Sequence, residues 1–188
     1  DVADATLLGF LDQTRNVLVG VEAAIDRALE EGWSMVLEGV HLVPGMLALE
    51  RHGALVVQCV ISISDEDAHR SHFWVRDSAT DGLRPLEKYL DGMPEIRMIQ
   101  DVLLDRAQIE DLLVDYYGQL GSGGKDFGDF YVEDGVLDVN GLVAQGQKGI
   151  EDLYKKVAEG APKRPGTFRM MLTNIKIVVN GATATADV

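Results

Sequence analysis

The sequence predicts two consecutive pieces, an α/β piece built on a parallel sheet and then an α+β piece. Residues 34–40 and 54–64 are near-continuous runs of Val, Ile and Leu, as expected of strands covered on both faces. The later part instead places short helices before long alternating strands. Formal charge also differs, with a net −10 over residues 1–104 and −4 over residues 105–188. We therefore predict two domains with these bounds.

Helical periodicity defines the other elements of the first piece. Apolar side chains recur at helical spacing over residues 7–31, and Gly32 follows as a stop signal. After the second predicted strand, Ser64 and the acids behind it predict a capped helix over residues 65–77. A polar, glycine-containing loop then leads to a short helix at 86–90. The order of helix, flexible loop and helix, with arginines at the hinge, predicts a lid.

The second piece begins inside a single long helix. An apolar stripe runs from Ile96 to Leu120, and we expect a junction between the pieces near Asp105. After it the pattern predicts a short helix at 125–135, a strand at 136–141, a helix at 146–160, and a hairpin over 167–188 that turns at Asn180-Gly181.

Composition limits the classes of partner. The chain has 188 residues, 46% of them apolar, and no apolar run approaches the roughly 18 residues that cross a bilayer. A formal charge of −14 repels nucleic acid and anionic membranes, so we expect neither as a partner. The one cysteine, Cys59, lies in an apolar run, which predicts a buried thiol and a reducing, cytoplasmic setting. Because the sequence starts at Asp1 without a methionine and stops in an alternating strand, we expect a fragment.

Polar side chains at two places suggest phosphate chemistry. Glu38 stands at the carboxyl end of a predicted parallel strand, the rim where α/β sheets bind ligands, and His41 follows it. In phosphoryl-transfer proteins such an acid holds magnesium or its water, although a strand end that merely surfaces would look the same. His69, His72 and Arg76 share one face of the 65–77 helix, with Arg70 beside them. Arginine binds phosphate through its planar fork, but next to acids it can equally form a surface ion pair worth under about 1 kcal/mol.

Four blocks in order resemble a known family. They are "FLDQTRNVLVGVEAAIDRAL", "VLEGVHLVPG", "ISDEDAHRSHFWVR" and "RPLEKYLDGMPEIRMIQDVLLDRA". Residues 7–107 thereby resemble archaeal-type 2-phosphoglycerate kinase, a small-molecule kinase with a P-loop fold. The resemblance implies transfer of the ATP γ-phosphoryl group to 2-phosphoglycerate, with ATP and Mg²⁺ as cofactors. It places Glu38 near magnesium and His41 near substrate, and it makes phosphate-facing lid groups of His69, Arg70, His72, Arg76 and Arg84.

One departure from that family is large. No G-x-x-x-x-G-K-S/T motif occurs in the chain, so the loop whose amides and lysine cradle the triphosphate is missing from these residues. We expect no measurable Mg-ATP binding and little catalysis by this chain alone. The metal-binding residues stay unassigned.

The second piece resembles another family. "DRAQIEDLLVDYYGQLGSGG", "FYVEDGVLDVNG", "GQKGIEDLYKKV" and "FRMMLTNIKIVVNGATATADV" resemble a SnoaL-like domain, the cone-shaped fold shared with nuclear transport factor 2, over residues 105–188. The resemblance implies a pocket, with candidates Tyr116, Tyr117, Asp138 and Asn174, and allows a homodimer. A carboxylate and a phenol in one pocket could serve an enolisation, but the base of steroid-isomerase relatives aligns with Val139, and Met170 and Met171 stand where catalytic relatives often have histidine. Both departures favour a binding pocket, and the tyrosines could also be core residues.

Three hypotheses follow for the function. The chain is part of a small-molecule kinase of the 2-phosphoglycerate type with an added SnoaL-like domain, or it is a non-catalytic ligand-binding or assembly protein whose kinase-like part is vestigial. The third hypothesis is a mosaic of two segments that do not belong to one natural gene. Reading the gene upstream for a strand and a P-loop would separate them.

Overall fold

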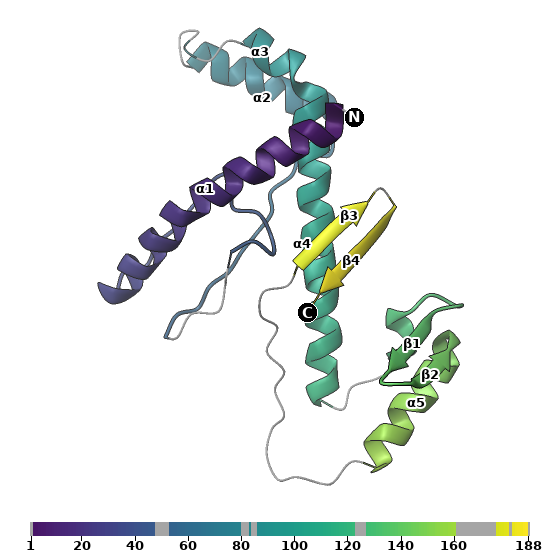
Figure 1. The fold of residues 1–188 in the computed structure, drawn as a ribbon. Coiled ribbons are helices and arrows are strands. Elements are labelled where there is room, and N and C mark those ends of the chain that lie inside the picture. Colours follow the sequence, from purple (N-terminus) through teal and green to yellow (C-terminus); the bar gives the residue numbers. More distant parts are fainter. Residues whose placement is uncertain are drawn as a thin grey trace. The chain divides into compact units, whose positions relative to one another are not determined.

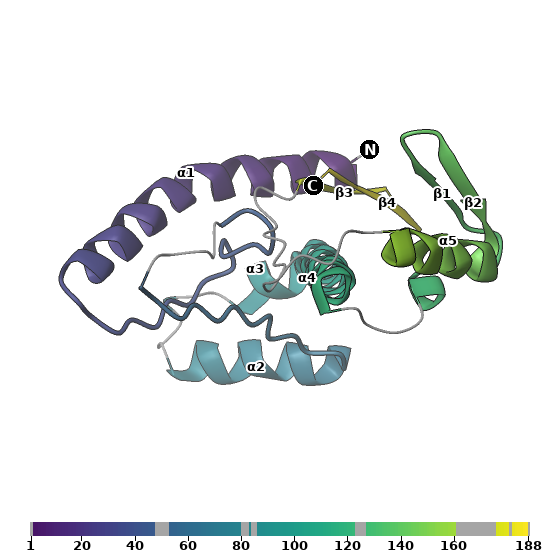
Figure 2. The same ribbon diagram turned by 90° about the horizontal axis from the view of Figure 1, so that it is seen from below.

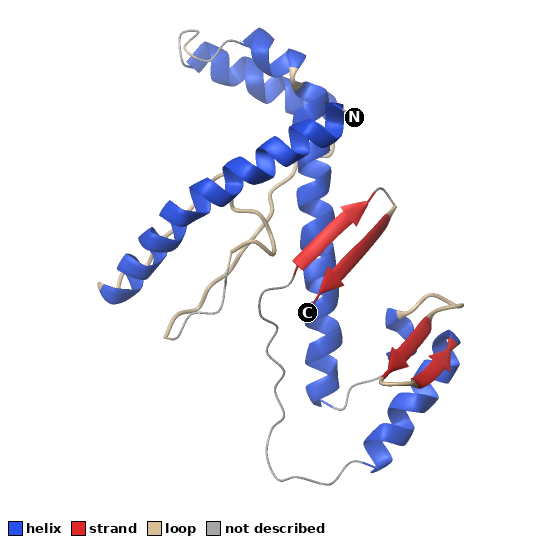
Figure 3. Cartoon of the chain, viewed as in Figure 1, coloured by secondary structure: helices blue, strands red, loops and turns tan. Residues whose placement is uncertain are grey.

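A computed structural model describes residues 2–47, 53–79, 83, 86–122, 127–160, 176–180 and 182–187. The described elements are mainly helices, with two small antiparallel sheets (Figure 1, Figure 3). In order they are α1 (Val2–Glu30), α2 (Glu66–Ala79), α3 (Leu86–Asp91), α4 (Met93–Ser122), the 3₁₀ helix η1 (Phe127–Phe130), β1 (Val136–Val139), β2 (Leu142–Gln145), α5 (Gly146–Gly160), β3 (Lys176–Asn180) and β4 (Thr183–Asp187).

The chain divides into two compact units. Unit 1 comprises residues 1–108 and 174–188, and unit 2 comprises residues 109–173, so α4 runs through both. The predicted domain boundary at residues 104 and 105 stays a prediction, because β3 and β4 group with the N-terminal residues rather than with unit 2.

Five of the predicted helices are confirmed, including the helix at 146–160, which is α5. The short helix predicted at 125–135 is reduced to the 3₁₀ helix η1, because residues 131–135 are not helical. The helix predicted over residues 7–31 corresponds to α1, and the helix predicted over residues 65–77 to α2. The short helix predicted at 86–90 corresponds to α3, and the long helix with the apolar stripe to α4. The cap of α2 differs from the prediction: Asp65, not Ser64, accepts a hydrogen bond through Oδ1 from the backbone N of Ala68 at 2.6 Å. A carboxylate fits there because it both satisfies an unpaired amide and faces the positive end of the helix dipole.

The predicted parallel sheet is wrong for the described part of the chain. Residues 33–39 and 54–65 are extended but belong to no strand, and both are drawn as loop in Figure 3. A strand needs backbone hydrogen bonds to a neighbour, and no described segment supplies them. Val36, Leu55 and Ile61 are accordingly 95%, 93% and 93% exposed. Cys59 is exposed as well, so its predicted burial is also wrong.

Unit 2 is built on a hairpin that packs against α5 (Figure 2). β1 pairs with β2 in the register Val136↔Gln145 to Val139↔Leu142. Asn140 and Gly141 have φ of 53° and 87°, as a tight two-residue turn requires. The predicted strand at 136–141 is confirmed for β1, whereas β2 was not predicted. Ile150 on α5 is fully buried and anchors this unit.

Unit 1 carries the second hairpin. β3 pairs with β4 from Lys176↔Asp187 to Asn180↔Thr183, which confirms the strands predicted at the end of the chain. The remainder of the predicted 167–188 hairpin lies outside the described residues. Ile177 on β3 is buried, and its carbonyl oxygen accepts a hydrogen bond from the buried Arg106 of α4 at 2.8 Å.

Candidate functional site

His41 is the predicted site residue that the structure fixes most closely. It lies in a turn after the first extended segment, and its ring stacks on Phe10 of α1 with centroids 5.1 Å apart. Its Nδ1 lies 2.9 Å from Oγ1 of Thr14, a fully buried residue of α1. The turn continues into Val43 and Pro44, both buried, and Nε of Arg106 donates to the Pro44 carbonyl at 2.9 Å. Contacts with α1, and the bond from Arg106 of α4 to the turn, therefore fix the position of His41.

Glu38 is placed differently. It is exposed, three residues before His41 in the extended segment, and no described residue contacts its carboxylate. Both residues do lie at the end of the predicted strand segment, as the sequence suggested. The structure thus brings one of the two into a packed environment and leaves the other in solvent.

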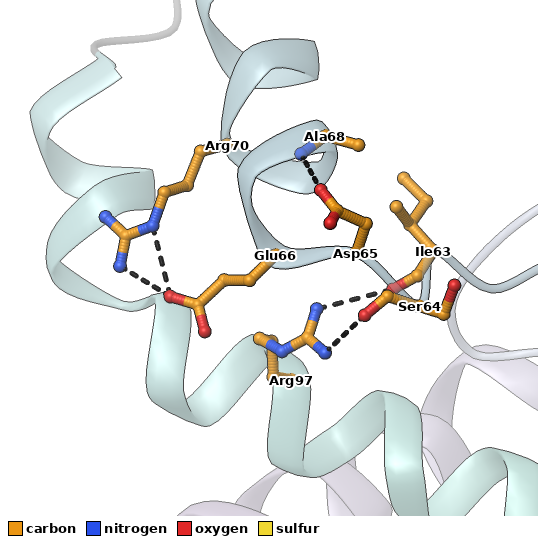
Figure 4. A network of polar contacts seen from close by, with 7 residues as sticks. All are labelled: Ile63, Ser64, Asp65, Glu66, Ala68, Arg70 and Arg97. Atoms are coloured by element: carbon orange, nitrogen blue, oxygen red, sulfur yellow. Dashed lines mark hydrogen bonds and ion pairs between the residues drawn. The ribbon is translucent and has the colours of Figure 1, made fainter.

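The N-terminal turn of α2 holds a polar network (Figure 4). Arg70 donates to Oε1 of Glu66 through Nη2 at 2.7 Å and through Nε at 3.1 Å. This charge-assisted pair lowers the pKa of Glu66 below its ordinary value, chiefly through the hydrogen bond from Arg70. Arg70 is thus engaged in the ion pair that the sequence allowed as the alternative to phosphate binding.

Arg97 of α4 contacts the end of the second extended segment in the same network. Its guanidinium donates to the carbonyl oxygens of Ile63 at 3.3 Å and Ser64 at 3.0 Å. Gln100, one turn later, donates to the Ile63 carbonyl and accepts from the Ile63 backbone N at 3.1 and 3.0 Å. Side chains of α4 therefore hydrogen bond to backbone groups of Ile63 and Ser64 that would otherwise be free to pair with a neighbouring strand.

Two of the other predicted lid residues, His69 and Arg76, take part in a stack between α2 and α3. His69 stacks on Phe73 at 5.3 Å, Phe73 on Tyr89 at 4.9 Å, and the Arg76 guanidinium lies 5.6 Å from the Tyr89 ring. Burial lowers the pKa of His69, with smaller contributions from Arg97 and His72. Its Nδ1 is buried with no hydrogen-bond partner in the described structure. His72 is exposed, and Arg84 lies outside the described residues.

Unit 2 contains a cluster of tyrosine hydroxyls. The hydroxyl of Tyr116 hydrogen bonds to that of Tyr131 at 3.1 Å and to that of Tyr154. Phe127 stacks on Tyr154 at 4.3 Å, and Tyr117 meets Tyr116 edge-on at 5.0 Å. Burial and the two phenolic neighbours raise the pKa of Tyr116 well above that of a free phenol, so its hydroxyl keeps its proton to higher pH.

Asp138 does not join this cluster. It is exposed on β1, and Oδ1 accepts from the backbone N of Gly141 at 2.9 Å, which stabilises the hairpin turn. The described residues therefore show the predicted phenol and the predicted carboxylate with separate partners. Asn174 lies outside the described residues.

A cavity of about 590 Å³ lies in unit 1. Side chains from the C-terminal half of α1 and from both extended segments line it, including Ile25, Leu29, Trp33, Leu37, Leu42 and Val57. Gln58 connects the second extended segment to the turn that follows the first, since its Nε2 donates to the Leu42 carbonyl at 3.0 Å. Among the described residues, the lining is largely apolar and its only ionisable side chain is the Cys59 thiol.

Several residues that shape these sites gave no signal in the sequence. Thr14, Arg97, Gln100 and Arg106 each bond to atoms at least 27 residues away, so no local spacing could reveal them. The β1–β2 turn did have a signal, because Asn140-Gly141 between two short apolar runs predicts a type I′ hairpin.

Comparison with known families now bears on both units. A model of the SnoaL-like domain matches residues 101–188, from the middle of α4 to the C-terminal end of the chain. This stretch is a SnoaL-like domain. The helices and small antiparallel sheets described there fit the α+β class expected for it.

The N-terminal and middle region is similar to 2-phosphoglycerate kinases. The enzyme of Methanopyrus kandleri is 37% identical over 112 residues, which are 59% of this chain and 34% of the relative. That of Methanothermobacter thermautotrophicus is 39% identical over 106 residues, 56% of this chain and 35% of the relative. The chain thus spans about a third of the length of these relatives. No solved structure matches.

The kinase resemblance implies ATP and Mg²⁺, and the residues present do not fit that pair. The printed sequence has no G-x-x-x-x-G-K-S/T loop. Within the described ranges, no group of three or more His, Cys, Asp or Glu side chains could hold a metal ion. No helix in the described part of the chain is long and apolar enough to cross a membrane.

Proposed function

We propose that unit 1 is the acceptor-side part of a phosphotransferase resembling 2-phosphoglycerate kinase. The observation that carries this proposal is the similarity of the N-terminal and middle region to that enzyme, at 34–39% identity in relatives from several archaea. In this reading the reaction is transfer of the ATP γ-phosphoryl group to 2-phosphoglycerate. Glu38, His41 and the lid residues of α2 would face the acceptor.

In this proposal, the nucleotide binds to polypeptide outside this chain. Because the residues present do not fit Mg-ATP, the donor site would come from polypeptide equivalent to the two-thirds of the relatives that this chain does not span.

The apolar surface of the extended segments supports the same division. Val36, Leu55 and Ile61 are almost fully exposed, and the cavity beside these segments is largely apolar. Exposed apolar patches of this kind mark surfaces that another polypeptide covers. Unpaired extended backbone with Val, Ile and Leu side chains also suits addition to a β-sheet.

Reconstitution tests the proposal. We would coexpress this chain with the part of the Methanopyrus kandleri enzyme that it does not match, add Mg-ATP and 2-phosphoglycerate, and follow 2,3-bisphosphoglycerate by ³¹P NMR. Product that requires both polypeptides and falls in the Glu38→Ala variant supports the proposal. A stable complex that makes no product would refute the assigned activity.

Calorimetry of the chain alone tests where the nucleotide binds. We expect no measurable heat with Mg-ATP, and the Glu38→Ala variant should behave identically. Micromolar binding by this chain alone would overturn the assignment of the donor site to other polypeptide.

A second function is proposed for unit 2, namely non-catalytic binding of a small ligand or assembly into a homodimer. The observation that favours it is the separation of roles among the described residues: the Asp138 carboxylate supports a turn while the Tyr116 hydroxyl bonds to other phenols. Thermal shifts with small carbonyl compounds, together with sedimentation equilibrium, test it. Saturable stabilisation that Tyr116→Phe abolishes and Asp138→Asn retains supports binding, whereas turnover that depends on Asp138 would contradict it.

A further inference from the structure

The contact between His41 and Thr14 fixes more than the position of a ring. Thr14 Oγ1 lies 2.9 Å from the Phe10 carbonyl oxygen, one turn earlier in α1, and also 2.9 Å from His41 Nδ1. A threonine hydroxyl has one hydrogen and can donate it to only one of these two atoms. The two contacts together therefore constrain which nitrogen of His41 carries its proton.

The Phe10 carbonyl receives the hydroxyl hydrogen. Two oxygens 2.9 Å apart with no hydrogen between them would repel each other, and a carbonyl oxygen can only accept. The lone pairs of Thr14 Oγ1 then face His41, so Nδ1 of the neutral imidazole must donate. Nε2 is left without a hydrogen and carries the free lone pair.

Packing keeps Nε2 available. Thr14 is fully buried and the ring of His41 stacks on Phe10, which holds the ring plane, so a flip of the imidazole within that plane would break the hydrogen bond to Thr14. His41 itself is only half-buried, and no described residue hydrogen bonds to Nε2. An oriented acceptor on a partly exposed surface suits a ligand that brings a hydrogen-bond donor.

We propose that Thr14 is a positioning residue that holds His41 with Nε2 as the hydrogen-bond acceptor for the hydroxyl group of a phosphorylated hydroxy acid. The identity of the ligand rests on the proposed function of unit 1; the geometry of the acceptor does not. A hydroxyl is the group selected, because carboxylate and phosphate oxygens are acceptors and gain no hydrogen bond from an unprotonated nitrogen.

NMR of the complete chain tests the tautomer without any enzymatic activity. With ¹⁵N-labelled histidine at a pH where the imidazole is neutral, two-bond correlations distinguish a protonated Nδ1 from a protonated Nε2. The sequence has four histidines, and His41→Gln identifies the relevant signals. We expect a proton on Nδ1 of His41, retained in Thr14→Ser and replaced by a mixture in Thr14→Val. A proton on Nε2 in the unchanged protein would overturn the proposal.

A matched pair of ligands tests the acceptor role. 2-Phosphoglycerate has a free hydroxyl on C3, whereas phosphoenolpyruvate carries the same carboxylate and phosphate without it. We expect 2-phosphoglycerate to shift the Nε2 signal of His41 and phosphoenolpyruvate to leave it unchanged. His41→Phe should weaken 2-phosphoglycerate binding about 2- to 10-fold, the value of one neutral hydrogen bond, and leave phosphoenolpyruvate binding unchanged.

The outcomes separate this inference from the proposed function. Equal shifts from both ligands, or none from either, would overturn the hydroxyl assignment even if reconstitution yields product. A failed reconstitution together with a selective shift from 2-phosphoglycerate would refute the kinase activity and support the site.

Discussion

Replacing Arg106 by alanine should destabilise unit 1 strongly. Arg106 is 7% exposed, and its guanidinium donates to the carbonyl oxygens of Pro44 at 2.9 Å and Ile177 at 2.8 Å. It therefore links α4 both to the turn that carries His41 and to β3. A hydrogen bond to a charged group contributes about 1.5–3 kcal/mol, which gives about 3–6 kcal/mol for the two bonds.

Water can reach the vacated carbonyl groups after truncation and recover part of that loss. We therefore expect the free energy of unfolding of unit 1 to fall by about 3 kcal/mol in Arg106→Ala, near the lower bound. Such a loss is a large part of the stability of an ordinary domain.

Tryptophan fluorescence in a urea titration measures this change. Both tryptophans of the chain, Trp33 and Trp74, lie in unit 1 with Arg106, so their emission follows the unit in question. The matched control is Arg15→Ala on α1, where the side chains of Arg15 and Asp12 are 62% and 72% exposed and their ion pair should contribute under about 0.5 kcal/mol. An Arg106→Ala midpoint equal to that of the Arg15→Ala control, at unchanged urea slope, would refute the reasoning.

Three further changes test other parts of the structure. Ile150→Ala removes a fully buried side chain from α5 and should cost unit 2 about 2–5 kcal/mol, read from tyrosine near-ultraviolet circular dichroism during unfolding; a loss under about 1 kcal/mol would mean that the site is not packed. Because the pKa of Tyr116 is raised, its contribution to stability is complete below pH 10.0 and is lost as the pH rises further. For the same reason Tyr116 should be the last phenol to ionise in an alkaline absorbance titration, and Tyr116→Phe should remove that last step. The lowered pKa of Glu66 contributes stability above pH 4.5 that is lost as pH falls, and Arg70→Ala should return that pKa toward 4.5 in a carboxyl ¹³C titration; an unchanged pKa would contradict the ion pair.

Local patterns predicted most elements of the fold. The apolar stripes of α1 and α4, the acidic first turn of α2, and the alternation of β3 and β4 act within a few residues, and each element formed as expected. The shift of the α2 cap from Ser64 to Asp65 shows the limit of this approach, because both residue types cap helices and only the geometry selects between them.

The candidate site depended on contacts that sequence spacing does not encode. His41 could be singled out at the end of an apolar run, but its partner Thr14 lies 27 residues earlier on another element. Tyr116 could be placed on a helix, yet its hydroxyl partners Tyr131 and Tyr154 come from separate parts of unit 2. Conversely, Arg70 looked suitable for phosphate, and the nearer acid Glu66 engaged it.

The predicted parallel sheet is absent from the described residues for the same reason: local sequence favours extended backbone, but a sheet also needs contacts between residues far apart in the sequence. Apolar β-branched sequence makes residues 33–39 and 54–65 extended, but pairing needs neighbouring backbone, and here Arg97 and Gln100 bond to Ile63 instead. Covering a fully exposed Val, Leu or Ile side chain contributes about 1.5–3 kcal/mol. Three such residues would give a covering polypeptide roughly 5–9 kcal/mol before the cost of ordering it, an upper value because unfolded chains already bury some apolar area. A polypeptide that covers these two segments would therefore stabilise unit 1, and the reconstitution experiment tests for such a polypeptide through the product that requires both chains.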